Sequence, residues 1–194
     1  MPTDELESRS SIRTETHTVN RLAFRCSRGH AAYPPQAPPR PAGMRIEVDD
    51  LTRQEVHDLL REHLANMYEL SPPESVHALD LAKLRAPDIT FWTVWEDSLL
   101  LGCGALKELA PTHGEVKSMR TPKALRRRGA GRAILAHIVA EARSRGYRRL
   151  SLETGSHQAF EPAQNLYASF GFAYCGPFGS YQADPNSIFM SLEL

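Results

Sequence analysis

Residues 114–135 read GEVKSMRTPKALRRRGAGRAIL. The stretch begins with a segment that can lie extended, turns at Pro122, passes through a cluster of Arg and Gly, and ends in an apolar-periodic helix. The first N–H groups of a helix point outward together at the positive end of the helix dipole, where anions bind. Glycine lets a phosphate approach the backbone closely, and arginine adds charge and planar hydrogen-bond forks. The stretch therefore predicts a phosphate-binding site.

The spacing of this site differs from two common phosphate motifs. It lacks the GxxxxGK[ST] of a P-loop and the full GxGxxG of a dinucleotide-binding turn. What remains is Arg126-x-x-Gly129-x-Gly131. A solvated basic helix start or a nucleic-acid patch is the alternative interpretation of such a short string. The secondary-structure elements around this string are needed to choose between a phosphate-binding loop and these alternatives.

Composition narrows the class of protein. A chain of 194 residues suggests one domain, with room for an extension. The formal net charge is zero, which argues against nucleic-acid and membrane partners, and no apolar run approaches the roughly 20 residues that span a bilayer. The three cysteines form no CxxC pair and indicate reduced thiols in a cytoplasmic protein, with Cys103 and Cys175 expected in packing positions.

Residues 1–43 differ from the rest of the chain. They contain few large aliphatic side chains and many Ser, Thr, Arg and Pro, so they cannot bury enough apolar surface to offset chain entropy. They also lack the apolar core of a secretory signal. We expect a disordered, Pro-rich N-terminal extension over 1–43 and one globular domain over 44–194. Met44 directly precedes the first expected strand, which leaves a translation start at that residue open.

Hydrophobic periodicity predicts the elements of the domain. Helices are expected over 52–67, 71–84, 130–145 and 159–170, and strands over 44–48, 89–96, 99–106, 115–121, 148–154, 172–175 and 188–192. The order is βααβββαβαββ, which predicts a mixed α/β sheet of about seven strands. Strands four and five should be parallel because a helix crosses between them. Gly102 and Gly104 in the third strand mark a bulge or a close approach of another backbone.

Two motifs lie on these elements in the expected order. The RxxGxG of residues 126–131 resembles the [QR]xxGx[GA] pyrophosphate loop of the GNAT superfamily of acetyl-CoA-dependent N-acetyltransferases. The AxxLYxxxGF of residues 163–172 resembles the segment that follows the fifth strand in that superfamily. The resemblance covers the whole domain and extends to a subgroup of small bacterial members. Many members carry Asn where this chain has Phe160, so no contact of that Asn is transferred.

The resemblance implies acetyl-CoA as co-substrate and a parallel pair of strands, four and five, that splays apart. It places the thioester against the splayed end of the fourth strand and the pyrophosphate on the Arg/Gly loop. The cofactor-binding residues that it implies are Met119, Arg120, Thr121, Arg126, Arg127, Arg128, Gly129, Ala130, Gly131 and Arg132. The implied reaction is direct attack of a primary amine on the thioester carbonyl in a ternary complex.

This reaction needs a base and an acid. An alkylamine with a pKa near ~10.4 must lose a proton before it attacks, and the departing thiolate is better expelled if it is protonated. For the acid the resemblance implies Tyr167, with a core tyrosine as the alternative. For the base Glu115 leads, because histone-acetylating members keep a catalytic Glu eleven positions before the residue equivalent to Arg126. Glu153, His77 and a water chain remain open.

The resemblance implies that the acceptor lies between the first two helices and the loop that joins the last two strands. The candidate substrate-binding residues are Glu74, His77, Glu153 and Tyr181. A small amine or an amino acid is the expected acceptor, and a peptide or protein acceptor is the alternative. A non-catalytic acyl-CoA-binding domain would share the loop, and a homodimer is left open. No metal is expected, because the histidines lack ligand spacing.

Overall fold

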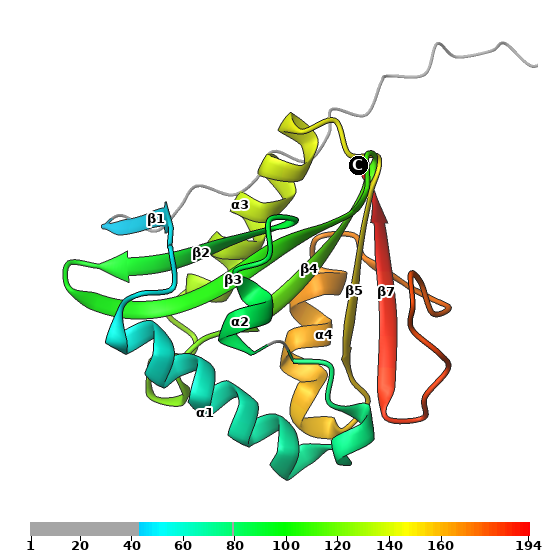
Figure 1. Ribbon diagram of the computed structural model, residues 1–194, viewed down its shortest axis with the longest axis horizontal. Helices are drawn as coiled ribbons and strands as arrows, with labels where there is room; N and C mark the ends of the chain where they lie inside the picture. Colours follow the sequence, from blue (N-terminus) through cyan, green and yellow to red (C-terminus); the bar gives the residue numbers. More distant parts are fainter. Residues whose placement is uncertain (1–42, 79) are drawn as a thin grey trace, which may run out of the picture. The chain divides into compact units, whose positions relative to one another are not determined.

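The computed structural model describes residues 43–78 and 80–194, so the extension predicted over 1–43 lies outside the described residues apart from Gly43. The described chain forms a seven-stranded sheet in the order β1-β2-β3-β4-β5-β7-β6 (Figure 1). The strands are β1 (Met44–Val48), β2 (Ile89–Glu96), β3 (Leu99–Ala110), β4 (His113–Arg120), β5 (Arg149–Gly155), β6 (Ala173–Cys175) and β7 (Ser187–Glu193). The helices are α1 (Gln54–Leu70), α2 (Leu81–Leu84), α3 (Ala130–Ser144) and α4 (Glu161–Ala168). The predicted βααβββαβαββ order is confirmed.

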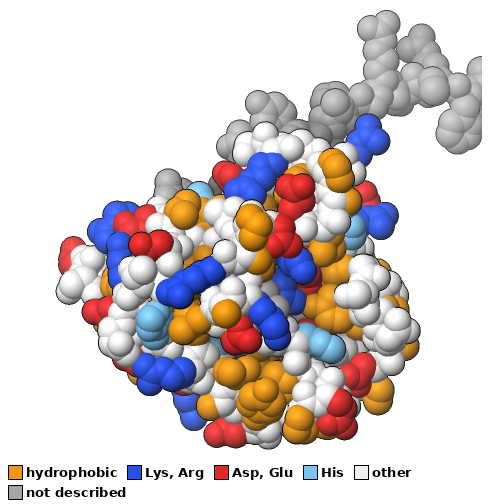
Figure 2. Space-filling view, viewed as in Figure 1, with side chains coloured by type: hydrophobic (Ala, Val, Ile, Leu, Met, Phe, Trp, Pro, Cys, Tyr) orange, Lys and Arg blue, Asp and Glu red, His pale blue; other side chains and the backbone are white. Residues whose placement is uncertain are grey.

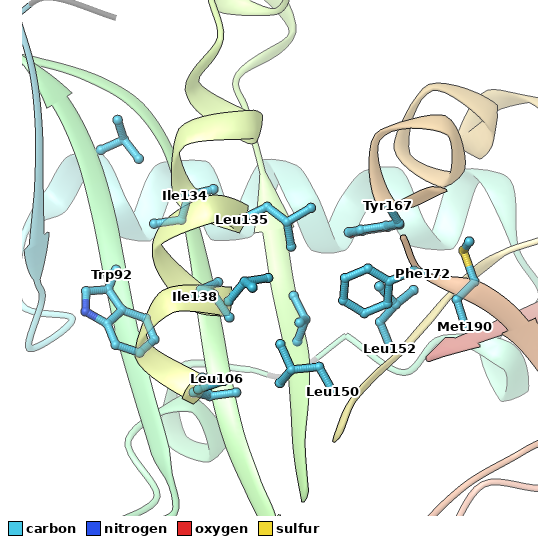
Figure 3. Packing of buried hydrophobic residues seen from close by; sticks show 14 of the residues in the cluster. Trp92, Leu106, Ile134, Leu135, Ile138, Leu150, Leu152, Tyr167, Phe172 and Met190 are labelled. Carbon is cyan, nitrogen blue, oxygen red and sulfur yellow. The ribbon is translucent and has the colours of Figure 1, made fainter. Parts of the chain in front are cut away.

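The alternation of side chains along the strands divides the core into two layers. On one face of the sheet, Ile134 and Ile138 of α3 pack over Trp92 and Leu106, and Tyr167 of α4 lies beside Phe172 (Figure 3). On the other face, α1 and α2 cover a second cluster. It contains Val56, Leu59, Leu60, Leu84, Phe91, Trp95, Cys103 and Ala105.

The parallel pair of β4 and β5 is short. The two strands pair only from His113↔Arg149 to Val116↔Leu152. Beyond that point β5 continues along β7 as far as Gly155↔Ser187, while β4 continues along β3 as far as Arg120. The sheet therefore opens between β4 and β5, as expected of a splayed pair.

A bulge in β4 lies next to this opening. Cys103 of β3 pairs with Arg120 and Ala105 pairs with Lys117, so two steps on β3 oppose three on β4. Ser118 takes up the extra residue with a left-handed φ of 52°, and its carbonyl oxygen accepts a hydrogen bond from Cys103 Sγ at 3.4 Å.

The glycines of the third strand were expected to mark a bulge or a close approach, and Gly102 has both. The register of β3 shifts between Val94↔Gly102 and Trp95↔Leu100, and a Cβ at Gly102 would lie 2.7 Å from the carbonyl oxygen of Arg120.

Two expectations are corrected. The helix predicted over 71–84 is interrupted: a 3₁₀ turn spans Pro73–Ser75, and α2 begins only at Leu81. The interruption has a local cause, because Asp80 caps α2 by accepting a hydrogen bond from the N–H of Lys83 at 2.9 Å. Cys175, expected in a packing position, is exposed on β6, whereas Cys103 is buried.

The surface offers no extended basic face in the orientation shown. Acidic, basic and apolar side chains are interspersed over the face seen in Figure 2. Nucleic-acid binding uses a continuous basic patch or stripe, which this face lacks. Within the described part of the chain, no helix combines the length and apolarity needed to cross a membrane.

The close approach at Gly102 gives a stability prediction. A Cβ at this position would lie 2.7 Å from the backbone carbonyl oxygen of Arg120, so Gly102→Ala must displace β4. We expect a loss of about 1–3 kcal/mol in the free energy of unfolding, measured by urea denaturation. The control is Gly176→Ala, where no atom lies within 4 Å of the added Cβ, and it should change stability by less than about 0.5 kcal/mol. Equal stability of the two variants would contradict a close contact between Gly102 and the backbone of β4.

Candidate active site

A pocket of about 1010 Å³ opens where β4 and β5 diverge. Its walls come from both faces of the sheet: the loop before α3, the start of α3 and α4 on one side, and α1 with the segment after it on the other. Nine of the ten residues that the sequence assigns to the cofactor line it. They are Met119, Arg120, Thr121, Arg126, Arg127, Gly129, Ala130, Gly131 and Arg132.

The anion loop, residues 126–132, runs into the N-terminus of α3. Gly129 is the N-cap residue with a φ of 90°, a left-handed conformation that suits glycine, and Arg127 is also left-handed at 65°. This terminus carries no side-chain cap and no acidic residue in its first turn. Its first N–H groups and the positive end of the dipole therefore face the pocket together with arginine side chains, an arrangement that binds phosphate groups.

Two arginines of the loop are held by the protein. Arg128 does not line the pocket, because its guanidinium forms an ion pair with Glu96 at the end of β2. Arg132 lines the pocket and is anchored: it donates to Ser169 Oγ at 2.9 Å, and its guanidinium lies 5.1 Å from the ring centroid of Phe170. Sequence spacing alone did not show that Arg128 points away from the pocket while Arg132 lines it.

Tyr167 reaches the pocket from α4. It is 6% exposed, and its ring packs against Phe172 with centroids 6.0 Å apart. Burial raises the pKa of Tyr167 above its usual range, and the negative charge of Glu153 raises it further. The phenol therefore stays protonated at neutral pH and can donate a proton in the pocket.

Glu153 reaches the pocket from β5. Its Oε1 accepts a hydrogen bond from Ser187 Oγ at 2.8 Å. Burial raises the pKa of Glu153 above that of an ordinary carboxyl, while the hydrogen bond from Ser187 and the charges of His77 and Lys117 act in the opposite direction. A carboxylate with a raised pKa in a pocket is a stronger base than one in water.

Glu115 does not line the pocket. It is 3% exposed, and its Oε1 accepts hydrogen bonds from Tyr181 Oη at 2.7 Å and from Lys117 Nζ at 2.9 Å. Lys117 Nζ also donates to Tyr181 Oη at 2.6 Å. Burial and the charge of Glu115 raise the pKa of Tyr181. Glu115, Lys117 and Tyr181 thus form a closed network, and Lys117 is the member that lines the pocket.

Some of the predicted acceptor residues line the pocket and others lie outside its lining. His77 lines the pocket, and the ring of Tyr181 lies behind it, with centroids 5.0 Å apart and the rings nearly perpendicular. Tyr181 itself is not part of the lining, and Glu74 is exposed outside it. Asn186 Nδ2 donates to Ser75 Oγ at 3.2 Å. The segment after α1 and the loop between β6 and β7 therefore contact each other beside the pocket.

The sequence did not point to three pocket residues of α1. Glu62, His63 and Asn66 face β4, where Arg120 donates to Glu62 Oε1 at 2.8 Å and to Asn66 Oδ1 at 2.9 Å. Burial and the charge of Arg120 lower the pKa of His63 to about 4, so its ring is neutral at pH 7. The sequence signal that could have found them is their spacing of three and four positions, which places Glu62 and His63 next to Asn66 on one side of a helix. No cluster of metal-ligating side chains occurs among residues 43–78 and 80–194.

Comparisons with known proteins agree with this geometry. The profile of the acetyltransferase (GNAT) family matches residues 54–172. The chain is 58% identical to the uncharacterized N-acetyltransferase YsnE of Bacillus subtilis, over 78% of this chain and 100% of that protein. It is 40% identical to the IAA acetyltransferase of Azospirillum brasilense, over 76% and 93% of the two chains.

A solved structure shares the fold. It is a GNAT family acetyltransferase from Elizabethkingia anophelis with acetyl-CoA bound, with a TM-score of 0.58 and 16% identity over 79% of this chain and 100% of that chain. The family profile spans most of the domain, and the relatives are similar over nearly their whole length. The chain belongs to the acetyltransferase (GNAT) family and is an enzyme of that class.

Proposed function

We propose that the protein transfers an acetyl group from acetyl-CoA to the primary amine of a small molecule or an amino acid, by direct attack in a ternary complex. The observation that carries this proposal is one pocket that joins the anion loop to Tyr167 and Glu153. A family structure with acetyl-CoA bound supports the donor. A relative named IAA acetyltransferase supports a small acceptor.

The donor would bind along the opening of the sheet. The anion loop and the N-terminus of α3 supply N–H groups and guanidinium groups for the pyrophosphate. Beyond Val116 the backbone of β4 does not pair with β5. Its polar groups on that side face the opening, where they can bind the pantetheine amides and stabilise the oxyanion that forms during acyl transfer.

Glu153 is the proposed base and Tyr167 the proposed acid. Glu153 takes a proton from the acceptor ammonium, and the nitrogen lone pair then attacks the carbonyl carbon. The carbonyl re-forms as the C–S bond breaks, and Tyr167 gives its proton to the departing sulfur. The second proton of the attacking nitrogen passes to the Tyr167 phenolate, which leaves a neutral amide and free thiol, and Glu153 releases the first proton to solvent. Both side chains line the pocket, whereas Glu115 is enclosed by Lys117 and Tyr181. For this reason we prefer Glu153 to Glu115.

Cofactor binding is tested at Gly131. A Cβ there would lie 3.5 Å from Leu166 Cδ2, an ordinary contact, and Asp in a first helical turn favours the helix, so Gly131→Asp should fold. Acetyl-CoA at a hundredfold excess over its Kd should stabilise the wild type by roughly 2.7 kcal/mol, seen as a rise in Tm. Gly131→Ala should keep this rise and Gly131→Asp should lose it. If acetyl-CoA raised the Tm of Gly131→Asp as much as that of the wild type, the anion loop would be excluded as the cofactor-binding site.

The acid is tested with Tyr167→Phe, which removes only the hydroxyl. We expect kcat to fall by about 10²–10⁴-fold, because the leaving sulfur loses its proton donor. The rise in Tm with acetyl-CoA should remain. Tyr174→Phe is the matched control, because Tyr174 is exposed on β6. Turnover of Tyr167→Phe within about threefold of wild type, measured by thiol release over a panel of amines, would leave Tyr167 a packing residue.

The base is tested through the pH dependence of kcat/KM. A general base acts only when deprotonated, so activity should fall as the pH drops through the pKa of Glu153, at a higher pH than for an ordinary carboxyl because burial raises that pKa. Glu153→Gln should remove this limb and recover partly at high pH, where the amine is already deprotonated. Glu115→Gln should keep the wild-type limb. If Glu115→Gln lost the acidic limb of the pH profile and Glu153→Gln kept it, Glu115 would be the base.

A further inference from the structure

The bulge at Ser118 turns two cations of β4 toward the same face of the sheet. In a regular strand, residues three apart point to opposite faces. Here Lys117 pairs with Ala105 and Arg120 pairs with Cys103. Directly opposed residues share a face, and both partners belong to the cluster under α1. Lys117 and Arg120 therefore stand on one wall of the pocket.

Both cations are nearly buried in that wall, with side chains 9% and 8% exposed. A buried cation is costly unless its charge and its donors are matched. Lys117 is matched by Glu115 and Tyr181, which are themselves largely enclosed. Arg120 is matched less well, because its only carboxylate partner among the described residues, Glu62, is 46% exposed and screened by water.

Three residues of this pocket lining, Arg120 among them, carry a buried hydrogen-bonding atom without a partner in the described chain. The Nε of Arg120 is buried and has no hydrogen-bond partner within the described chain, and the same holds for Ser118 Oγ and His63 Nδ1. All three residues line the pocket. His63 is neutral at pH 7, so its ring does not add to the charge. A guanidinium, a hydroxyl and an imidazole in the lining of one pocket suit a planar anion with several acceptor oxygens.

We propose that the acceptor is an amino acid whose carboxylate binds at Arg120 and Lys117 while its amine faces Glu153. This inference rests on the proposed function and narrows its acceptor class. The wall on β4 carries the cations and β5 carries the carboxylate of Glu153, so the pocket has two poles of opposite charge. A simple alkylamine that pairs with Glu153 would bring no anion to Arg120. An amino acid matches both.

The test compares free amino acids with their C-terminal amides, which keep the amine and lose the anionic charge. For the wild type we expect kcat/KM for the preferred amino acid to exceed that for its amide by about 10- to 100-fold, the range for a charge-assisted contact. Arg120→Gln should reduce this ratio to near one by raising the KM for the acid. The KM for acetyl-CoA should stay within about threefold, because the contact that we propose between β4 and the cofactor is made by backbone groups, which the substitution keeps. Lys117→Gln should reduce the ratio in the same direction.

The control is Arg145→Gln, which removes an arginine that pairs with Glu141 at 2.9 Å outside the pocket, and it should leave the ratio unchanged. Three results would overturn the inference: amides used as well as acids by the wild type, an equal loss for acids and amides in Arg120→Gln, or acetylation of alkylamines but of no amino acid. All three leave acetyl transfer intact. Failure of the proposed function would instead appear as no rise in Tm with acetyl-CoA and no turnover of any amine.

Discussion

The site depends on where the hydrogen bonds of β5 go. After Leu152 this strand continues to pair with β7 but no longer with β4, so the sheet keeps its continuity on one side and opens on the other. The opening connects two faces that a closed sheet would separate. The N-terminus of α3 and Tyr167 of α4 thereby share a pocket with the polar side chains of α1. Without the divergence, backbone pairing would fill the place that we propose for the thioester.

The bulge at Ser118 sets the chemistry of the wall beside that opening. It costs a left-handed φ at a non-glycine residue, and β4 lies so close to β3 that a Cβ at position 102 would be 2.7 Å from the carbonyl oxygen of Arg120. In return Lys117 and Arg120 share a face. The Lys117–Glu115 pair then ties Tyr181, and with it the loop before β7, to the middle of the sheet. A buried pair of this kind adds little net stability, and we attribute to it the placement of that loop.

Local sequence patterns were sufficient to predict most of the fold. Periodicity, turn residues and the Arg/Gly string are short-range signals, and they predicted the element order, the anion loop and the helix that holds Tyr167. The features that the sequence did not predict depend on long-range contacts. Arg128 turns to a glutamate 32 positions away, and Glu115 is enclosed by a tyrosine 66 positions away. Neither partner is visible to a local pattern. The part that α1 contributes to the pocket follows from the register of β4, which a bulge of one residue alters.

The two carboxylates on this face are separated by environment rather than by residue type. Glu115 is paired with Lys117 and lies outside the pocket lining, whereas Glu153 is part of that lining. The charge of Glu153 also raises the pKa of Tyr167, which couples the proposed base to the proposed acid. While Glu153 is charged, the phenol holds its proton. In the proposed reaction Glu153 loses its charge when it takes the proton of the amine, and the part of the increase in the pKa of Tyr167 that this charge causes is then lost, while the part caused by burial remains. The proposed acid would therefore become a better donor at the stage when the departing sulfur needs its proton.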